Sequence, residues 1–391
     1  MNIVYVYGRD WPSEKAGISF STYTGYGIAE NGDENNVDMI FARNTNENIN
    51  EVLKSNFEIE IKNNFNIHLL DNSSILSETT KFYFQAFNKI RKLHKKNMID
   101  VVITRTVKFL PFMYILKSIY NITVIYEAHS FYLDPDFKNE YDRKKEFLYQ
   151  KYTLNKLDGI ICHQKILKEL YQNYIPKQNY CIARTGIKEL HYNNNLWENN
   201  YIGYIGSLYE SKGVKDLFYA FKNIDDKNLK LLIIGGRAKR INKYNKLAEE
   251  LGIKDRVEIT GWLSKSEMNK YLKKIKIGVV PIKDTFHNRY LTSPMKIFDY
   301  FSHGIPVVAN DLPPVREIVT ENGGLFFENG NIDSLVKTLN KMNSSKKKYK
   351  HYSSYILKRA EKLTWKNRGE KILNFVKDVK VQEVENGKIF N

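Results

Sequence analysis

The sequence is poor in the residues and segments that mark several large classes of protein. Its 391 residues include two cysteines, Cys162 and Cys181, which are too few for a disulfide framework or a cysteine-rich metal site. The longest apolar run in the most hydrophobic stretch is 109–116, far short of the roughly 20 residues of a membrane-spanning helix. Residues 1–7 lack the basic region and cleavage site of a signal peptide and resemble a first strand. We therefore expect a cytoplasmic protein without transmembrane helices.

Acidic residues are also few, 44 against 61 basic ones, which gives a formal net charge of +17. Arginine supplies only 13 of the basic residues in a chain rich in Asn, Ile and Tyr, so AT-rich coding bias explains much of the lysine excess. Lysine lacks the planar paired donors that read nucleic-acid bases, and we expect no nucleic-acid partner. The excess lies beyond Glu198, with 36 basic against 21 acidic residues. This charge favours anionic nucleotides or lipid headgroups, although we expect most of these lysines on solvated faces.

One segment is a candidate for contact with a membrane. In 81–96, Phe82, Phe84 and Phe87 interleave with lysines and an arginine at helical spacing. A helix of this kind can lie on an anionic lipid surface, at the inner face of the cell membrane. The same pattern fits a helix with one core face and one solvated face, so both interpretations stay open.

Apolar runs of strand length alternate with helix-length amphipathic stretches along the whole chain, which is typical of βαβ units around parallel sheets. The predicted strands are 3–7, 37–42, 66–70, 100–104, 123–127 and 159–162, then 201–205, 231–234, 257–260, 277–281 and 306–309. The polar, Asn-rich segment 191–200 separates the two sets and predicts an interdomain linker. We expect an α/β fold with two doubly wound domains, at 1–196 and 197–366, and ligands at the carboxyl ends of the strands.

Clear helix signals follow the predicted strand 277–281. Ser293 is a good N-cap residue, Pro294 suits the first helical position, and Gly304 suits the end of a helix. The sequence therefore predicts a short helix over 294–303. The free amides at the start of this helix would form an anion site. Asp299, inside the helix, is placed to accept hydrogen bonds from a ribose. The alternative is that Asp299 pairs with Lys296 or Lys274.

A second candidate site follows the predicted strand 201–205. The loop begins at Gly206 and ends at Gly213, and glycines permit close approach of main chain to a ligand. Lys212 stands just ahead of the next helix, where an ammonium and backbone amides together stabilise a diphosphate. The next two strands also run into glycine, at Gly236 and Gly261.

Taken in order, these motifs resemble the nucleotide-binding domain of GT-B fold glycosyltransferases, specifically the retaining enzymes of family 4, the glycosyl transferases group 1. The resemblance covers most of 201–365 and rests on the sequences at 204–208, 212–213, 233–236, 259–262, 279–281 and 293–311. In the first half, Tyr126-Glu127-Ala128-His129 resembles the strand end that carries the family's active-site histidine. The resemblance implies two Rossmann-like domains facing across a cleft, with a terminal helix at 367–391 that packs on the first.

The resemblance implies a role for each matching residue. Catalytic roles fall to His129, which would contact the donor sugar, Lys212, which would neutralise the leaving diphosphate, and Asp299, which would hold the ribose. The implied donor-binding residues are Gly17 in the loop after the first strand, Gly206, Ser207, Gly236, Gly261, Trp262, Thr292, Ser293, Pro294, Met295 and Lys296. The implied acceptor or cleft residues are Arg105, Glu127 and Arg289, and Arg105 with Glu127 equally suits a structural ion pair.

Two of the departures from the family pattern concern the donor site. Ser207 stands where the family usually has an arginine, so Arg289 or Lys296 would have to supply the missing positive charge. Leu291 stands at the first position of the Glu-X7-Glu pattern, of which Asp299 takes the second. Both departures affect how the donor would be held.

The implied function is that of a hexosyltransferase that moves a sugar, with retention, from a nucleotide-diphosphate sugar to a hydroxyl of a glycan or lipid-linked acceptor in cell-surface polysaccharide synthesis. We expect no metal or other cofactor, because Lys212 and a helix dipole would handle the charge. The sequence Asp134-Pro135-Asp136 has the form of a metal-binding Asp-X-Asp motif, but its proline predicts a turn. Two alternatives stay open: a UDP-sugar 2-epimerase-like enzyme, and a non-catalytic partner subunit that binds nucleotide-sugar.

Overall fold

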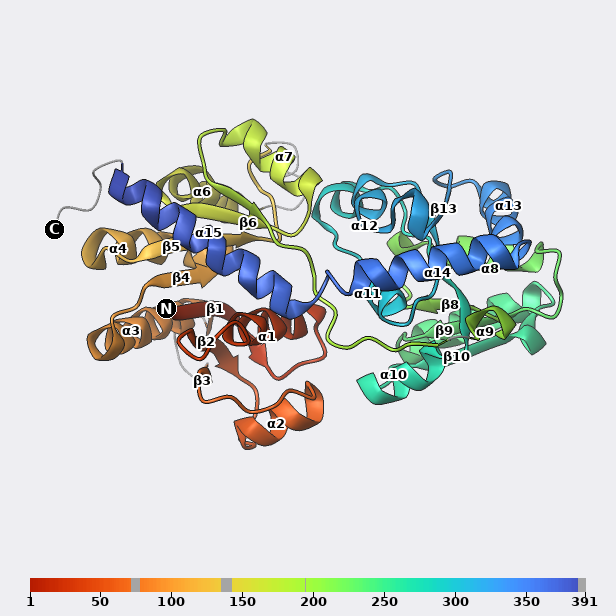
Figure 1. Ribbon diagram of the computed structural model, residues 1–391, viewed down its shortest axis with the longest axis horizontal. Coiled ribbons are helices and arrows are strands. Elements are labelled where there is room, and N and C mark those ends of the chain that lie inside the picture. Colours follow the sequence, from red (N-terminus) through yellow and green to blue (C-terminus); the bar gives the residue numbers. More distant parts are fainter. Residues whose placement is uncertain (72–77, 135–142, 194, 386–391) are drawn as a thin grey trace. The chain divides into compact units, whose positions relative to one another are not determined.

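The computed structural model of the chain describes residues 1–71, 78–134, 143–193 and 195–385 (Figure 1). The chain divides into two compact units, one made of Met1–Gly186 with Trp365–Asn391 and the other of Ile187–Thr364. Each unit is a parallel sheet with helices between its strands, which confirms the predicted α/β fold class. The second aspartate of the Asp-X-Asp sequence lies outside the described residues.

The first unit contains a seven-stranded parallel sheet in the order β3-β2-β1-β4-β5-β6-β7. Its strands are β1 (Asn2–Trp11), β2 (Asn36–Arg43), β3 (Phe65–Leu70), β4 (Val101–Thr104), β5 (Thr123–Ala128), β6 (Gly159–Cys162) and β7 (Tyr180–Ile182). Its helices are α1 (Ala16–Ala29), α2 (Ile49–Asn56), α3 (Glu78–Asn97), α4 (Leu110–Tyr120), α6 (Lys144–Thr153), α7 (Lys165–Tyr174) and α15 (Trp365–Glu385). The strand order reverses between β1 and β4, the point where ligands bind in open sheets of this type.

The last helix, α15, belongs to the first unit and runs along α1 (Figure 1). Two glycines permit this close approach. A Cβ on Gly27 would lie 2.2 Å from the Trp365 carbonyl oxygen, and a Cβ on Gly369 would lie 2.2 Å from the Gly27 carbonyl oxygen. Since the obstacles are backbone atoms, larger residues at either position would separate the two helices.

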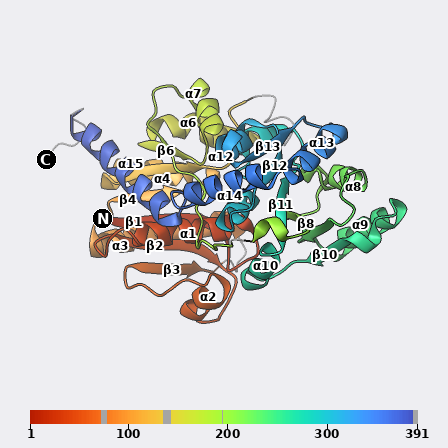
Figure 2. The same ribbon diagram turned by 45° about the vertical axis from the view of Figure 1, so that its right-hand side comes forward.

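The second unit contains a six-stranded parallel sheet in the order β10-β9-β8-β11-β12-β13. Figure 2 labels β8, β10, β11, β12 and β13 of this sheet. Its strands are β8 (Tyr201–Ile205), β9 (Lys230–Ile234), β10 (Val257–Gly261), β11 (Ile275–Val280), β12 (Val307–Asn310) and β13 (Gly324–Phe327). Its helices are α8 (Val214–Lys222), α9 (Ala238–Glu250), α10 (Lys265–Leu272), α11 (Met295–Ser302), α12 (Pro313–Gly323), α13 (Ile332–Asn343) and α14 (Lys346–Ala360). Here the strand order reverses between β8 and β11.

The boundary between the units lies earlier than the polar 191–200 segment suggested. Ile187 donates its backbone N–H to the Leu363 carbonyl at 2.6 Å, and His191 donates to the Ser302 carbonyl at 2.7 Å. Leu196 is buried in the core of the second unit. These contacts attach the Asn-rich segment to the second unit, so the boundaries fall after Gly186 and before Trp365.

The predicted membrane segment 81–96 lies within α3. Its Phe82 and Ile90 are buried in the first unit, whereas Phe84 is 55% exposed. Most of the apolar face of α3 therefore packs in the protein core, as the second of the two interpretations expected. Across the described ranges, no helix combines the length and apolar character needed to cross a membrane.

Candidate functional site

Lys212 and the two glycines of the first loop lie at the carboxyl end of β8. Gly206 and Gly213 have φ values of +129° and +69°. A Cβ on Gly213 would lie 1.7 Å from the Pro281 carbonyl oxygen, so this position has no room for a side chain. Lys212 ends a short 3-10 turn (Glu210–Lys212) directly before α8. Burial lowers the pKa of the Lys212 ammonium.

Lys296 lies beside this loop, although it is far away in the sequence. It is in the first turn of α11, which follows β11, and its Nζ lies 4.1 Å from the centre of the Tyr204 ring. A Cβ built on Gly206 would be 3.5 Å from the same Nζ. Burial, and then repulsion by the Lys212 ammonium, lower the pKa of Lys296 to about 7. The same two causes lower the pKa of His287.

Lys212 and Lys296 therefore form a pair of partly buried cations at the point where the strand order reverses. Among the described residues, neither ammonium has an ion-pair or hydrogen-bond partner. Removing like charges from water without a counter-ion is unfavourable, and a bound anion would relieve that cost. The pair is thus suited to a diphosphate, and of the two residues proposed for the missing charge, Lys296 is the one beside the loop.

Arg289, the other candidate for that charge, has a partner of its own. Its Nε donates to Asp284 Oδ1 at 2.9 Å, and a second guanidinium nitrogen also donates to this carboxylate. Arg289 lies in a π-helical turn (His287–Leu291) that precedes α11. Its charge is therefore neutralised within the second unit.

The start of α11 differs by one residue from the prediction. Pro294, and not Ser293, occupies the N-cap position, and the helix begins at Met295. Thr292, just before it, donates its hydroxyl to Asn288 Oδ1 at 3.2 Å. Since a proline side chain cannot cap a helix, the first amides of α11 receive no cap from it.

Asp299 is paired, but not with the lysines that the sequence suggested. Its Oδ1 lies 2.7 Å from Nζ of Lys265, the first residue of α10. The Asp299 side chain is 21% exposed and the Lys265 side chain 37%. The pair is therefore accessible to solvent and to a ligand.

The remaining predicted donor residues lie at neighbouring strand ends. Gly236 and Gly261 have φ values of +101° and +76°, and a Cβ on Gly236 would lie 2.6 Å from the Leu208 side chain. Trp262, after β10, is 63% exposed. The Ser207 carbonyl accepts a hydrogen bond from the Tyr204 hydroxyl at 2.8 Å. The carboxyl edge of the second sheet thus gathers the residues from these separate motifs.

In the first unit, Arg105 and Gly17 are in direct contact. The sequence suggested a loop at Gly17, but α1 begins at Ala16, so Gly17 lies in the first turn of this helix. The Arg105 guanidinium donates to the Gly17 carbonyl and to Ser21 Oγ, each at 3.0 Å. It also lies 4.5 Å from the Tyr7 ring centre. Arg105 is therefore held by α1 at the carboxyl end of β4.

Glu127 and His129 follow one another at the end of β5, but their environments differ. Glu127 is 1% exposed and accepts hydrogen bonds from Tyr5 and Arg368. The suggested Arg105–Glu127 ion pair is thus replaced by Arg368–Glu127, and the buried carboxylate is not presented to an acceptor. Burial opposes ionisation of Glu127, but Arg368 and His129 outweigh it, so its pKa is lowered.

His129 is a neutral imidazole at physiological pH. Burial and then the Arg105 charge lower its pKa to about 4. Its ring stacks on His163 at 5.1 Å and meets Phe20 edge-on at 4.8 Å. Its Nε2 has no hydrogen-bond partner among the described residues. A neutral imidazole with a free nitrogen can bind a hydroxyl group.

Sequence reasoning missed Arg368 and Lys265 as partners of site residues. Arg368 is 241 positions from Glu127, and Lys265 is 34 positions from Asp299. Neither spacing corresponds to a turn of helix or a strand repeat, so no local pattern connects them. Only the packing of α15 and α10 brings them to these carboxylates.

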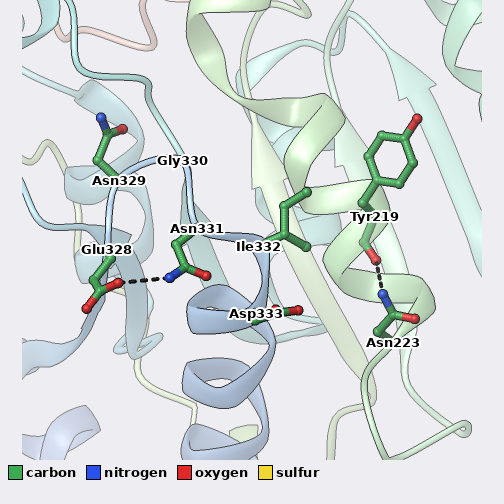
Figure 3. Close-up of a pocket in the computed structure, with 8 residues that line it drawn as sticks. All are labelled: Tyr219, Asn223, Glu328, Asn329, Gly330, Asn331, Ile332 and Asp333. Atoms are coloured by element: carbon green, nitrogen blue, oxygen red, sulfur yellow. Dashed lines mark hydrogen bonds between the residues drawn. The ribbon is translucent and has the colours of Figure 1, made fainter.

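A separate hollow in the second unit contains none of the predicted site residues (Figure 3). It is lined by residues from the end of α8, from the loop between β13 and α13 and from the start of α13, namely Tyr219, Asn223, Glu328, Asn329, Gly330, Asn331, Ile332 and Asp333. Glu328 accepts a hydrogen bond from Asn331 at 2.8 Å across its wall. In the parts of the chain that the structure describes, no three His, Cys, Asp or Glu side chains gather closely enough to hold a metal ion.

Comparison with known proteins identifies a family domain within the second unit. The family model described as "Glycosyl transferases group 1" matches residues 188–359. An alpha-monoglucosyldiacylglycerol synthase from Streptococcus pneumoniae is 23% identical over 273 residues, which cover 63% of this chain and 60% of that protein. The matched region thus spans less than two thirds of the curated relative.

Solved structures resemble the whole chain. A sucrose-phosphate synthase from Thermosynechococcus elongatus has a TM-score of 0.75 at 14% identity, covering 97% of this chain and 99% of its own. Anabaena HepE in complex with UDP and glucose has a TM-score of 0.71 at 13% identity, covering 97% and 100%. At these identities the likeness establishes the fold. The chain therefore has the GT-B fold, and its residues 188–359 match the domain of the glycosyl transferases group 1.

Proposed function

We propose that the protein is a retaining glycosyltransferase of family 4 that transfers a hexose from a nucleotide-diphosphate sugar to a hydroxyl of a glycan or glycolipid. The observation that carries this proposal is the Lys212–Lys296 pair, two partly buried lysines without an ion-pair partner among the described residues, at the strand reversal of the second sheet. The group 1 match covers this region, and HepE, which shares the fold, was solved with UDP and glucose. This hexose transfer would be a step in the synthesis of cell-surface polysaccharide or glycolipid.

In the proposed reaction the bond between the anomeric carbon and the diphosphate oxygen breaks first. The acceptor hydroxyl then attacks the anomeric carbon from the same face, and its proton passes to the leaving phosphate. Lys212 and Lys296 stabilise the negative charge that develops on the diphosphate, and Asp299 holds the ribose hydroxyls. His129, neutral at physiological pH, binds a hydroxyl of the donor sugar. In this proposal, catalysis comes from electrostatic stabilisation and positioning. The two lysines, and not a metal ion, balance the charge that develops on the diphosphate.

The first test is thermal stabilisation by UDP, GDP, ADP, CMP and their sugar conjugates, each with and without magnesium. A ligand at about 100 times its dissociation constant should add about 2.7 kcal/mol of stability. We expect one diphosphate to stabilise the wild type without metal and Lys212→Ala to lose the effect. Turnover of the same conjugate should fall by roughly 10²- to 10³-fold in Lys212→Ala, the size expected for loss of one charge-stabilising donor. Equal binding and turnover in Lys212→Ala would overturn the site.

One observation favours a second candidate, a non-catalytic subunit that binds nucleotide-sugar. Leu291 is 7% exposed and offers no oxygen to the donor sugar at the position where the family has a glutamate. Binding of a nucleotide-sugar with no transfer to any of a broad acceptor panel would support this subunit. Formation of a new sugar epimer without acceptor would instead indicate the 2-epimerase chemistry, and an anomeric product of unchanged configuration would establish retaining transfer.

The proposed lipid-linked acceptor also requires a surface that meets the membrane, and the exposed apolar side chains favour α4 and α6 over α3. Ile119 on α4 is 62% exposed and Tyr152 on α6 is 58% exposed. Lysines accompany them: Lys156 Nζ lies 4.7 Å from the Tyr114 ring centre, and Lys151 Nζ lies 5.7 Å from that of Tyr152. Exposed apolar side chains with lysines beside them suit an anionic lipid surface.

Co-sedimentation with vesicles tests this surface. We expect the wild type to bind vesicles that contain anionic lipid, less strongly at high salt, and Ile119→Ser with Tyr152→Ser to reduce binding. Val381→Ser is the matched control, because Val381 is 55% exposed in the same unit but lies on α15. Equal binding by the double variant and the control would contradict a membrane contact through α4 and α6.

A further inference from the structure

We propose that Arg368, on α15, is a positioning residue for the transfer reaction: it occupies the Glu127 carboxylate and so leaves His129 Nε2 free for the donor sugar. This inference rests on the proposed function, in which His129 binds that sugar. Arg368 itself touches neither reacting group in this scheme. It acts only through Glu127.

The Arg368 guanidinium is anchored on several sides within the first unit. Arg368 is 2% exposed, and its Nε donates to Thr24 Oγ1 at 3.0 Å. A second nitrogen donates to the backbone carbonyls of Ala183 and Arg184, and the third donates to Glu127 Oε1. These bonds fix the guanidinium in one place and orientation. An arginine can make them together because its donors form a rigid planar fork.

Each oxygen of the Glu127 carboxylate accepts a hydrogen bond in this arrangement. Its Oε1 accepts from Arg368 and its Oε2 accepts from Tyr5. His129 Nε2 lies 3.7 Å from the same Oε1, too far for a hydrogen bond. Arg368 therefore holds the oxygen that His129 would otherwise approach. Among the described residues, Nε2 is a buried polar atom without a hydrogen-bond partner, and such an atom calls for a ligand or another explanation.

The charged and titratable groups around His129 come from four elements or their ends. They are Glu127 on β5, Arg105 after β4, His163 after β6 and Arg368 on α15. Burial and the two arginines favour the neutral imidazole, whereas the Glu127 charge favours the protonated one. Burial and the Arg105 charge are the largest causes, and Arg368 adds to them, so the neutral form prevails and its nitrogen can share a hydrogen bond with a sugar hydroxyl.

Loss of the Arg368 charge would change this balance. The buried Glu127 carboxylate would then keep only Tyr5 as a donor, and an ion pair with a protonated His129 would compensate its charge. The Glu127 charge would then raise the pKa of His129 without the opposing effect of Arg368, so that pKa should rise. His129 Nε2, which already lies 3.7 Å from Glu127 Oε1, would then move into hydrogen-bonding distance of this oxygen and be lost to the sugar.

The experiment is an NMR titration of the His129 imidazole in the full-length protein, with the signal assigned by its absence in His129→Gln. We expect Arg368→Met to raise the pKa of His129 above its wild-type value of about 4. Transfer by Arg368→Met should then fall on the acid side of the raised pKa. Lys380→Met is the matched control. Lys380 also joins α15 to the rest of the first unit, through an ion pair with Asp100 that does not involve His129. It should leave the titration unchanged.

A double variant and a conservative variant separate this role from a general loss of packing. Arg368→Met with Glu127→Gln removes both charges and should return the pKa of His129 to its low value. Arg368→Lys keeps the positive charge and should preserve the low pKa of His129. If Arg368→Met does not fold, Arg368→Gln replaces it, since glutamine retains amide donors but carries no charge. An unchanged His129 titration in either folded neutral variant would overturn the inference.

The outcomes also distinguish the inference from the proposed function. An inactive His129→Gln with no titration change in Arg368→Met would refute the role of Arg368 and leave the transferase proposal standing. A fully active His129→Gln would refute the sugar-binding role of His129, and the positioning role of Arg368 with it, even if the titration responds to Arg368.

Discussion

Lys265 Nζ lies 2.7 Å from Asp299 Oδ1, so the carboxylate proposed to hold the ribose is already paired with a cation from α10. Both side chains are partly exposed, and pairs of this kind contribute about 0.2–1 kcal/mol to stability. The pair therefore leaves the carboxylate accessible. Its second oxygen and the Lys265 ammonium are both available to ribose hydroxyls.

A ribose role for Asp299 predicts a loss that depends on the sugar hydroxyls. Asp299→Ala should weaken binding of the preferred nucleoside diphosphate by roughly 10- to 100-fold, because a hydrogen bond to a charged group contributes about 1.5–3 kcal/mol and about 1.4 kcal/mol corresponds to tenfold. It should leave binding of the 2′,3′-dideoxy analogue unchanged. Isothermal titration calorimetry with both ligands measures the difference. An equal loss for the two ligands would mean that Asp299 acts by another route.

Lys265→Met serves as the companion variant for that measurement. We expect it to change the free energy of unfolding by less than about 1 kcal/mol, because the ion pair is exposed. Urea unfolding of the wild type and the variant checks this value. A much larger loss would mean that Lys265 supports α10 rather than the ligand.

Lys296 predicts a dependence of stability on pH. Below pH 7 it is protonated in both the folded and the unfolded chain, since its folded pKa is about 7 and its ordinary value is 10.5. Between these values only the unfolded chain keeps the proton, so unfolding takes up a proton and this residue adds stability as pH rises. Lys296→Met should therefore stabilise the free protein at pH 6 more than at pH 9. Urea unfolding at the two pH values measures the difference.

The same lysine predicts that binding of the diphosphate takes up a proton. A diphosphate favours the charged ammonium, so above pH 7 Lys296 must gain a proton as the ligand binds, and affinity should fall as pH rises from 6 to 9. Calorimetry in buffers of different ionisation enthalpy measures the uptake. Lys296→Met should abolish the uptake, whereas the matched nucleoside without phosphates should show none with the wild type.

Much of this arrangement follows from local sequence signals. Each strand predicted from an apolar run is present, whereas β7 and β13 were missed because β7 is only half-buried and β13 begins with a glycine. The order of the strand ends places Lys212 and the glycines on one edge, as the motifs indicated. The partners of Glu127 and Asp299 could not be predicted, because Arg368 and Lys265 reach them only through the packing of α15 and α10.

The last prediction concerns Gly213, which positions Lys212 at the start of α8. Gly213 and Gly252 have nearly equal φ values, +69° and +67°, but a Cβ on Gly213 would lie 1.7 Å from the Pro281 carbonyl oxygen, whereas a Cβ on Gly252 would meet nothing within 4 Å. Gly252→Ala should therefore cost only the left-handed backbone strain, about 1–2 kcal/mol. Gly213→Ala adds a clash with backbone and should cost clearly more, and it should also weaken diphosphate binding because Lys212 must move. Urea unfolding of the two variants isolates the clash, and equal losses would show that the loop relaxes around the added methyl group.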